Sequence, residues 1–457
     1  MPAGWQRKRL SDLGVWRGGG TPSKSTPEYW VPTGIPWVSP KDMKSVRVVD
    51  TEDHISREAL AKSAAKIIPP NSVLYVVRSG ILRRILPVSI LTVEGAVNQD
   101  LRAFTPSAQI EPEYVYYYSV GENRRILRDC MKDGTTVESL DVPSLQTIQI
   151  PFPPLPEQRR IVAKIEELFT QVDAGVQALE RAKVLLKQYR QSLLKSAFSG
   201  KVTEKWRQEN RDKIEPASLL LERIREERKK KMGKRYKELP TLDTSSLPEL
   251  PEGWAWARFT DIFDCRLGKM LDQAKNLGTL HPYLGNINVR WHSFDLIELK
   301  EIRLQSEEIE NVSAVSGDLI ICEGGEPGRC AVWEKSHTIV IQKALHRARP
   351  LAGIISHLYA WQLELDSSTH RLARLFTGTT IKHLPGEKLF EYLVRVPPKE
   401  EQAFLCDTLD THMADVEGLG GLVAKVDASA EPLRQSILTR AFKGKLVPAS
   451  ESERKHG

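Results

Sequence analysis

Apolar residues along the chain form two long helical seams, separated by regions of short apolar runs. From Pro156 onward they recur at steps of three, four or seven residues, the spacing of one face of a long α-helix. The same spacing returns after Pro398. The first seam is Ile161, Ile165, Leu168, Val172, Val176, Leu179, Leu186, Leu193 and Ala197, and the second is Leu405, Leu409, Met413 or His412, Val416, Val423, Ala430, Leu433 and Ile437. The pattern predicts helices at residues 157–200 and 399–445.

Boundary residues support both helices. Pro156 and Pro398 stand just before them, and Gly200 and Gly444 stand just after. At 1.5 Å per residue, about 42 residues make a rod near 60 Å long. An apolar seam exposed to water is unfavourable, so it must be covered by the other helix, by a helix of another protein, or by both. A bend in the second helix is expected at its glycines, which are Gly418, Gly420 and Gly421.

The remaining regions are rich in Gly, Pro and short β-type runs, as in Val73–Val77, Leu319–Cys322 and Thr338–Ile341. Helical patches at Glu113–Leu127 and Ile354–Leu375 accompany these runs. The mixture predicts compact α/β domains. The expected organisation is residues 1–156 (domain 1), helix 157–200, a charged helix and Pro-rich linker at 201–252, residues 253–398 (domain 2), helix 399–445 and a tail at 446–457.

The sequence restarts halfway along the chain. Gly4-Trp5 returns as Gly253-Trp254, 249 residues later (253 − 4), and Glu157-Gln158 returns as Glu401-Gln402, 244 residues later (401 − 157). Further pairs at the offset of 244 are Gly134-Thr-Thr136 with Gly378-Thr-Thr380, Gln191–Leu194 with Gln435–Leu438, and Ala197–Lys201 with Ala441–Lys445. Chance does not explain such a series in register, so the chain is one module written twice.

The charge distribution gives only weak support for nucleic-acid binding. The net charge is +7, but residues 201–238 hold 14 Lys and Arg against 8 Asp and Glu, an excess of +6. Domain 1 has an excess of +3 (19 − 16), whereas residues 239–399 are acidic by 2 (18 − 20). The charged segment is either a solvated helix or a contact with phosphates or a partner.

Several other protein classes lack support. No apolar run approaches the roughly 18 to 20 residues that cross a bilayer, and Met1–Leu10 is not a secretory signal. The five scattered cysteines suggest reduced thiols in a cytoplasmic protein. The sequence has no Gly-x-x-x-x-Gly-Lys-Ser/Thr loop, no Asn-Pro-Pro-aromatic methyltransferase motif, no Pro-Asp…Glu-x-Lys nuclease set and no His-Glu-x-x-His pair. We therefore expect a chain that is not an enzyme by itself, with no catalytic residue and no metal site.

These features resemble the specificity subunits of type I restriction–modification systems over almost the whole length. The resemblance is carried by Gly4-Trp5…Leu10-Ser-Asp-Leu13, Gly18-Gly-Gly-Thr21-Pro22…Tyr29-Trp30…Gly34–Val38, Leu155–Val162 and Leu193–Lys201. The second copy departs from the pattern: Pro397–Phe404 lacks the basic pair after Glu-Gln, and Lys269–Arg290 lacks the Thr-Pro and Pro-Trp-Val signatures. This departure suggests that domain 2 grips a different half-site.

The resemblance implies α/β (α+β) target-recognition domains in two pseudo-repeated copies, separated by two long antiparallel coiled-coil helices. It implies a double-stranded DNA target with two half-sites, each read by one domain, and helices that set the spacing. Family members dock two modification subunits, which methylate adenine N6 from S-adenosylmethionine, and two restriction (motor–nuclease) subunits, which use ATP and Mg. The chain itself is expected to bind no cofactor and no membrane.

Polar loops beside the β runs are the expected carriers of DNA contacts, since base edges and phosphates are bound by Arg, Lys, Asn, Gln and hydroxyl groups. In domain 1 the candidates are Thr21, Ser23, Lys24, Lys41, Arg78, Ser79, Arg83, Arg84 and Asn98. In domain 2 they are Lys269, Lys275, Asn286, Asn288, Arg290, Arg329, Gln342 and Lys343. Asn98 and Gln342 correspond at the offset of 244. The two Gly-Thr-Thr segments contact phosphates or simply form turns.

The helical seams are the expected interface with partner subunits. Its candidates are Gln158, Ile161, Ile165 and Val172 in the first helix and Gln402, Leu405, Leu409 and Val416 in the second. Two other functions stay open: a stand-alone DNA methyltransferase or nuclease with unrecognised motifs, and a coiled-coil scaffold that does not read DNA.

Overall fold

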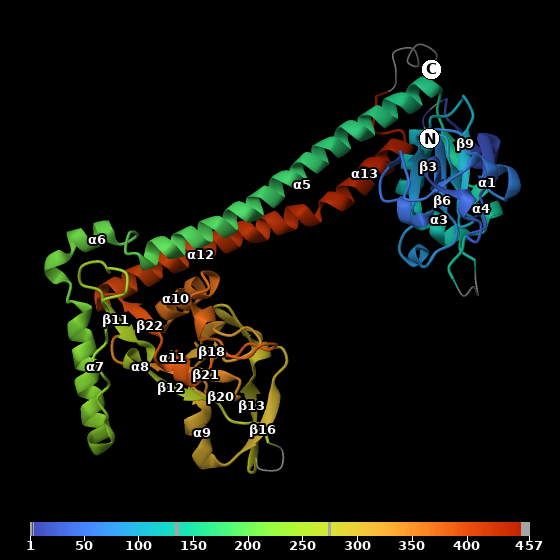
Figure 1. Cartoon of the computed structure of the whole chain (residues 1–457). Coiled ribbons are helices and arrows are strands. Elements are labelled where there is room, and N and C mark those ends of the chain that lie inside the picture. The colour runs from blue at the N-terminus through green and yellow to red at the C-terminus, as the bar shows by residue number, and fades with distance from the viewer. Residues whose placement is uncertain (1, 3, 133–136, 273–275, 449–457) are drawn as a thin grey trace. The chain divides into compact units, whose positions relative to one another are not determined.

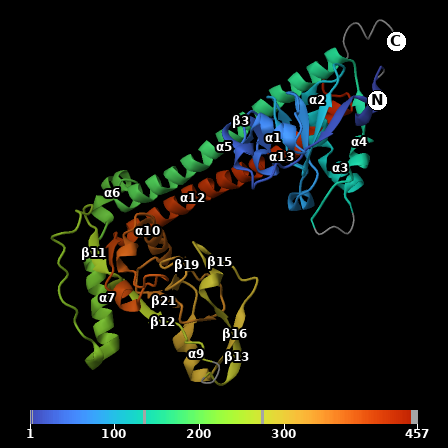
Figure 2. The same ribbon diagram turned by 45° about the vertical axis from the view of Figure 1, so that its right-hand side comes forward.

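The computed structural model describes residues 2, 4–132, 137–272 and 276–448. Contacts divide the chain into two compact units: unit one is residues 1–180 with 424–457, and unit two is residues 181–423. In both views each unit contains an α/β domain with helical segments beside it (Figures 1 and 2). The 44-residue helix α5 (Leu155–Phe198) contributes its first part to unit one and its last part to unit two.

Domain 1 is built on a five-stranded sheet in the order β2-β9-β6-β7-β4, with a three-stranded sheet β5-β3-β8 and a pair β1-β10. The strands are β1 (Gln6–Arg9), β2 (Gly14–Gly18), β3 (Trp30–Val38), β4 (Arg47–Val48), β5 (His54–Ile55), β6 (Ser72–Val76), β7 (Val88–Leu91), β8 (Ala96–Val97), β9 (Leu101–Pro106) and β10 (Gln149–Phe152). The helices are η1 (Leu10–Asp12), η2 (Pro27–Tyr29), η3 (Pro40–Asp42), α1 (Arg57–Lys62), η4 (Gly80–Arg83), α2 (Pro112–Gly121), α3 (Asn123–Cys130) and α4 (Val142–Gln146).

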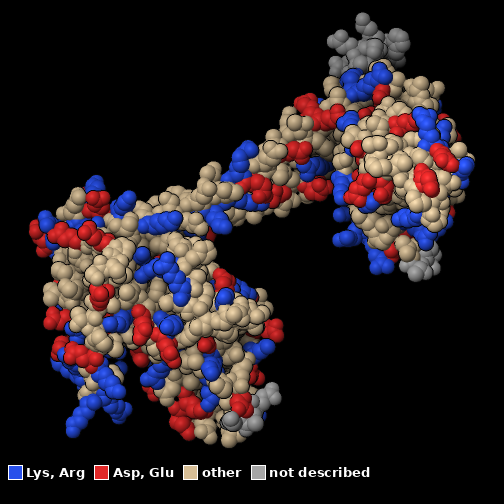
Figure 3. All heavy atoms as spheres, viewed as in Figure 1, with Lys and Arg blue, Asp and Glu red and all other residues tan. Residues whose placement is uncertain are grey.

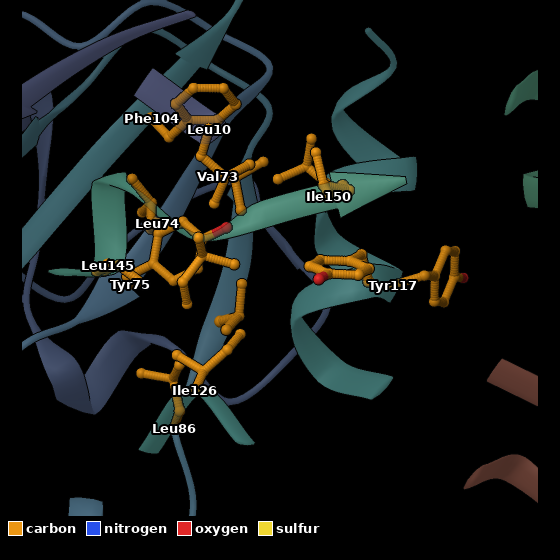
Figure 4. Packing of buried hydrophobic residues seen from close by; sticks show 14 of the residues in the cluster. Leu10, Val73, Leu74, Tyr75, Leu86, Phe104, Tyr117, Ile126, Leu145 and Ile150 are labelled. Carbon is orange, nitrogen blue, oxygen red and sulfur yellow. The ribbon is translucent and has the colours of Figure 1, made fainter. Parts of the chain in front are cut away.

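The core of domain 1 lies around the central strand β6, whose five residues are all buried (Figure 4). Tyr75 of this strand is fully buried and shares a 2.8 Å hydrogen bond with Ser119 of α2. Tyr117 and Tyr118 of the same helix are buried as well and pack against this core.

Domain 2 has a four-stranded sheet β12-β21-β18-β19, a four-stranded sheet β16-β13-β20-β17 and the pairs β11-β22 and β14-β15. The strands are β11 (Ala255–Arg258), β12 (Phe263–Leu267), β13 (Thr279–Leu284), β14 (Val289–Arg290), β15 (Ser293–Phe294), β16 (Lys300–Leu304), β17 (Ser313–Ala314), β18 (Leu319–Cys322), β19 (Cys330–Val332), β20 (Ile339–Ile341), β21 (Leu345–Pro350) and β22 (Leu393–Val396). The helices of unit two outside α5 are α6 (Glu204–Glu209), η5 (Arg211–Lys213), α7 (Ala217–Met232), η6 (Gly233–Arg235), α8 (Phe259–Ile262), η7 (Asn286–Asn288), α9 (Ser306–Val312), α10 (Ser356–Ser368), η8 (Leu372–Leu375), α11 (Gly386–Phe390) and the first part of α12 (Lys399–Ala428).

The two domains share one topology. The order β2-β9-β6-β7 in domain 1 matches β12-β21-β18-β19 in domain 2. The parallel pair β3–β8 matches the parallel pair β13–β20. The internal repeat of the sequence is therefore a repeat of the fold.

Long helical segments pair antiparallel within each unit. In unit one, α5 meets α13 (Ala430–Phe442), with Arg160 binding the carbonyl of Pro448 and Asp173 pairing with Arg434. In unit two, α5 meets α12, with Arg190 3.6 Å from Glu417, while Arg207 just beyond α5 pairs with Glu401. In both units, contacts further along α5 meet residues earlier in α12 or α13. The predicted antiparallel arrangement is therefore confirmed within each unit.

The end of each long helix meets the start of a domain. Gly200 and Gly444 both adopt positive φ, the left-handed conformation that favours glycine. A Cβ atom at Gly200 would collide with Pro251, and one at Gly444 would collide with Pro2. The chain's last helix therefore occupies, on domain 1, the place that the end of α5 occupies on domain 2.

The second long helix is interrupted beyond its three glycines. Gly418, Gly420 and Gly421 lie inside α12, and the helix is interrupted at Ser429 instead. Pro432 explains the position, because proline cannot donate to the carbonyl four residues earlier, that of Ala428, and its ring crowds that carbonyl. The sequence signal was present in this proline rather than in the glycines.

Candidate nucleic-acid interface

Four loops of domain 1 meet at the ends of its strands. Gly20 N donates to Val97 O (3.0 Å), Asn98 N to Val38 O (2.9 Å) and Val77 N to Asp100 O (2.8 Å). These bonds join the loops that follow β2, β3, β6 and β8. We call residues 19–24, 39–42, 77–84 and 98–100 the domain 1 loop cluster.

The same bonds recur in domain 2. Lys269 N donates to Ile341 O (2.9 Å), Gln342 N to Leu284 O (3.0 Å) and Glu323 N to Ala344 O (2.9 Å). A fifth segment, residues 377–383, joins this group because Leu384 N donates to Glu323 O (2.7 Å), as Leu140 N does to Val77 O (2.8 Å) in domain 1. We call residues 268–272, 285–290, 323–329, 342–344 and 377–383 the domain 2 loop cluster. The expected correspondence of Asn98 with Gln342 is confirmed.

The candidates of domain 1 differ in how free their side chains are. Among the described residues, Lys24, Arg78 and Arg84 are exposed and have no ion-pair partner. Thr21, Ser23 and Arg83 are exposed but bound to neighbours: Thr21 to Gln99, Ser23 to Ser25, and Arg83 to Glu138. The hydrogen bond from Arg83 lowers the pKa of the Glu138 carboxyl.

Three candidates of domain 1 are held by local structure. Lys41 bridges Glu52 (2.7 Å) and Asp53 (3.0 Å), and these carboxylates raise its pKa. Ser79 is half-buried and accepts a hydrogen bond from Ile81 N at the start of η4. Asn98 is buried and accepts from Asp100 N (3.1 Å), so its side chain shapes a turn rather than facing solvent.

In domain 2 most candidate cations already have partners. Lys269 pairs with Glu308, Arg290 with Asp295 (3.2 Å) and Arg329 with Glu326 (2.9 Å). Lys343 is exposed and has no ion-pair partner within the described ranges. Lys275 lies outside the described residues, as does the Gly134–Thr136 segment of domain 1.

The three amides of domain 2 have different surroundings. Asn286 is half-buried, and its Nδ2 lies 3.5 Å from Gly324 O. Gln342 is half-buried beside Gly285. Asn288 is buried, accepts from Gly285 N (2.9 Å) and donates to Asp295 O and Glu298 O. Both ends of the Asn288 amide are therefore used inside the chain. Asn288 corresponds to Asp42, because Asp42 accepts from Ser39 N in η3 as Asn288 accepts from Gly285 N.

Most of the candidate partner-interface residues are buried by the chain's own segments. Gln158 is fully buried, accepts from Glu111 N (3.0 Å) and donates to Gln109 O and Pro153 O. Gln402 is fully buried, accepts from Ile355 N (3.3 Å) and donates to Pro397 O (3.0 Å). The apolar candidates Ile161, Ile165, Leu405, Leu409 and Val416 are buried too, and Val172 is half-buried. Both seams are buried by the chain itself near the domains, whereas their middle parts are half-buried and Leu433 is 50% exposed.

Two further features lie near these sites. The exposed residues of segment 377–383 include Ile381 and Lys382, which sequence reasoning missed because only the Gly-Thr-Thr repeat pointed to this segment. The second feature is the end of α7 with η6, which belongs to the charged segment for which solvent, phosphate and partner contacts stayed open. Residues 228–237 hold seven Lys and Arg and no Asp or Glu, and they form a basic arm at the end of α7 (Figure 3).

Other kinds of site find little support in the structure. No three His, Cys, Asp or Glu side chains of the described residues gather as they would around a metal ion. Across the same part of the chain, no helix is long and apolar enough to span a bilayer. All five cysteines are free, and burial raises the pKa of the Cys130 and Cys322 thiols to about 11.

Comparison with known proteins bears on the loop clusters. A family described as type I restriction modification DNA specificity domain matches residues 2–181. The EcoR124I/EcoR124II type I restriction enzyme specificity subunit of Escherichia coli is 40% identical over 174 residues, which are 38% of this chain and 43% of that relative. Residues 2–181, which hold domain 1 and the first part of α5, therefore match the DNA specificity domain of type I restriction–modification systems.

Further type I specificity subunits of Escherichia coli match 59% to 76% of this chain, at 23% to 26% identity. The chain spans less than half of the first relative named above, and it spans longer shares of the others at lower identity.

Two solved structures match the fold over nearly the whole chain. One comes from a study of complex assembly and conformational transition of the type I R-M system, with a TM-score of 0.65, 17% identity and coverage of 97% of this chain and 99% of that one. The other is the HsdS subunit from Thermoanaerobacter tengcongensis, with a TM-score of 0.62, 18% identity and coverage of 97% and 98%. Both structures share the fold of this chain, which has two α/β domains and long helices that pack together.

Proposed function

We propose that this chain is the specificity subunit of a type I restriction–modification system and that it reads a double-stranded DNA sequence made of two half-sites, one for each domain. The supporting observation is the pair of loop clusters: the same backbone hydrogen bonds hold both, while the side chains that they present differ. A shared backbone with different side chains is what two different half-sites require. Residues 1–156 and 253–398 are then the two target-recognition domains.

The long helices set the distance between the half-sites. At 1.5 Å per residue, the 44 residues of α5 span about 66 Å. Half-sites one DNA turn apart are separated by about 34–36 Å. A helix of this length is long enough to place the two domains on such half-sites when the width of each domain is included. A fixed helix length in both copies makes the spacing a property of the chain.

DNA contacts come from the exposed members of each loop cluster and from the basic arm. Among the described residues of the two loop clusters, the cations without an ion-pair partner are Lys24, Arg78 and Arg84 of domain 1 and Lys343 and Lys382 of domain 2. Domain 2 (residues 253–398) has no net charge, with 17 Lys and Arg against 17 Asp and Glu (17 − 17), and the adjoining segment 201–238 carries an excess of +6. We propose that the basic arm supplies phosphate contacts that domain 2 lacks.

Two modification subunits dock on exposed parts of the helices, since a repeated fold presents nearly the same surface twice. In unit two, Val184, Leu185 and Tyr189 of α5 and Leu419 and Leu422 of α12 are exposed and apolar. In unit one, a groove of about 560 Å³ runs between α5 and α13. We propose these surfaces as the partner interface, and the groove includes Val172 of the predicted interface.

The remaining chemistry belongs to the partners. The modification subunits use S-adenosylmethionine to methylate adenine, and two restriction subunits use ATP and Mg to translocate and cut DNA. The chain itself binds no cofactor under this proposal, and it acts in the cytoplasm, where DNA is available.

The decisive experiment is single-molecule sequencing of DNA from cells that carry this chain with its modification partner. The expected result is one methylated-adenine motif with two half-sites at fixed spacing. Absence of such a motif, with partners shown to be active on another specificity subunit, would contradict the proposal. Methylation or cleavage by the purified chain alone would instead show an enzyme, and salt-insensitive partner binding without sequence preference would show a scaffold.

A further inference from the structure

Four exposed apolar side chains lie on the domain 2 loop cluster: Met270 (54% exposed), its neighbour Leu271 (45%), Ile287 (58%) and Ile381 (65%). Met270, Ile287 and Ile381 are the most exposed of them, and each lies on a different loop. Side chains of this size favour burial, so three of them on neighbouring loops mark a surface that another molecule covers.

The loops that carry them are joined to one another. Met270 follows Lys269, which forms a bridge with Gln342, and Gln342 N donates to Leu284 O at the base of the Ile287 loop. Asn286, next to Ile287, reaches Gly324 O, and Gly324 bridges His383 at the end of the Ile381 segment. All three side chains therefore belong to one group of connected loops.

The equivalent positions of domain 1 have different chemistry. Gly20 and Lys269 make the same backbone bond, so Thr21 corresponds to Met270. The turns η3 and η7 are closed by the same side-chain bond, so Lys41 corresponds to Ile287. Val137 corresponds to Ile381 at the offset of 244 and is 39% exposed. Two of the three apolar positions of domain 2 are thus polar or charged in domain 1.

The surroundings favour DNA as the covering molecule. Exposed cations, Arg290, Lys343 and Lys382, lie in the same loops. Polar residues flank each apolar position: Asn286 and Asn288 flank Ile287, Thr380 and Lys382 flank Ile381, and Lys269 and Asp272 flank the pair Met270-Leu271. The core of a protein interface is instead a continuous apolar patch. In a DNA groove, apolar side chains can contact the edges of the bases while nearby cations contact the phosphates on either side.

We propose that domain 2 reads its half-site through contacts of Met270, Ile287 and Ile381 with thymine 5-methyl groups in the major groove. The thymine methyl is the apolar group that base edges present there. This inference rests on the proposed function and adds the chemistry of one half-site: domain 2 takes a thymine-containing half-site, and domain 1 reads its own mainly through hydrogen bonds and charge.

The test uses the full chain in complex with its modification subunits and the duplex found by methylome sequencing. Each thymine of both half-sites is replaced singly by deoxyuridine, which removes the methyl group and leaves base pairing intact. Affinity is expected to fall about fourfold for each contacted methyl, the value of one buried methyl-sized group. The losses should fall in one half-site only.

Variants then assign the losses to domain 2. In Met270→Ala, Ile287→Ala and Ile381→Ala, deoxyuridine at the matching thymine should have no further effect. Leu219→Ala, a change at an apolar residue of α7 that is 44% exposed and lies outside the loop cluster, should keep the wild-type response.

Full affinity for every deoxyuridine duplex in the wild-type complex would overturn the inference, as would a target with no thymine in one half-site. Enhanced 2-aminopurine fluorescence without any deoxyuridine effect would show that these side chains wedge between bases instead, and would also overturn it. In both cases specific binding to the methylated motif would still stand, so the proposed function is judged separately by that motif.

Discussion

Domain 1 and domain 2 show which parts of a repeated fold are free to change. The backbone bonds that join the loops are the same in both, and so are the glutamines that fix each helix to its domain. The side chains at the loop tips differ: Thr21 and Lys41 in one domain stand where Met270 and Ile287 stand in the other. The scaffold is therefore retained where it holds loops in place, and it varies where a target would be touched.

The largest effect is expected at the buried glutamines. In Gln158→Ala three backbone groups lose their partner, and in Gln402→Ala two do. A buried polar group left without a partner costs roughly 1–3 kcal/mol, so we expect about 4 and about 3 kcal/mol of lost stability. Calorimetry should show the loss in unit one for Gln158→Ala and in unit two for Gln402→Ala. Gln188→Ala, on the exposed face of α5, is the control; equal losses in all three would refute the comparison.

The attachment of α5 to domain 2 should depend on acid. Burial raises the pKa of Glu364, but hydrogen bonds from His292 (2.7 Å) and Arg190 (2.7 Å) outweigh it and leave the pKa lowered. A lowered pKa means that the stabilisation is complete above the ordinary value of 4.5 and is lost as pH falls through the folded-state value. We expect Glu364→Gln to lower the stability of unit two by about 2 kcal/mol at pH 7, with the difference shrinking below pH 4.5.

Thermal unfolding of both proteins between pH 3 and 7 measures this dependence. Glu417→Gln removes a more exposed carboxylate 3.6 Å from Arg190 and should change little. A gap between Glu364→Gln and wild type that stays constant with pH would contradict the role of the carboxylate. Unit one uses Tyr117 with Glu166 (3.4 Å) at the position of Trp361 with Asp410 (2.8 Å), and its transition should not respond to Glu364→Gln.

Much of this organisation could be predicted from the sequence, because it depends on periodicity. The apolar seam predicted both long helices, and Gly200 and Gly444 marked their ends. The fixed offsets predicted that Asn98 and Gln342 correspond. Periodicity reports only which residues share a face of a helix.

Contacts between distant segments could not be predicted in this way. Gln158 lies near the start of the helical seam, yet its side chain is buried in the chain's own domain, where it accepts a hydrogen bond from Glu111 N. The sequence offered Lys41 and Lys269 as cations for DNA contacts, but they form ion pairs with Glu52 and Glu308. The exposed Ile287 and Ile381 were passed over because only polar residues were considered as contacts.

A smaller effect should separate the cations of the two domains. Arg78 and Arg84 have no partner among the described residues, and Lys343 is their counterpart in domain 2. If they contact phosphates, the slope of log affinity against log salt falls by about 0.9 for each charge removed. We expect a change of about 1.8 for Arg78→Ala with Arg84→Ala and about 0.9 for Lys343→Ala. Arg128→Ala, which removes an exposed cation paired with Asp129, should leave the slope unchanged.

The smallest effect concerns the glycines of the two long helices. Gly175 lies inside α5 and Gly418 inside α12, and a Cβ atom at either would meet nothing within 4 Å. Alanine in an exposed helix interior is favoured over glycine by about 0.8–1 kcal/mol, so Gly175→Ala should stabilise unit one and Gly418→Ala unit two by that amount. Gly444→Ala should do the opposite, because its φ is +68° and Pro2 fills the space. A loss of stability in Gly418→Ala would mean that α12 has to flex there, and the two helices would then differ in stiffness as well as in sequence.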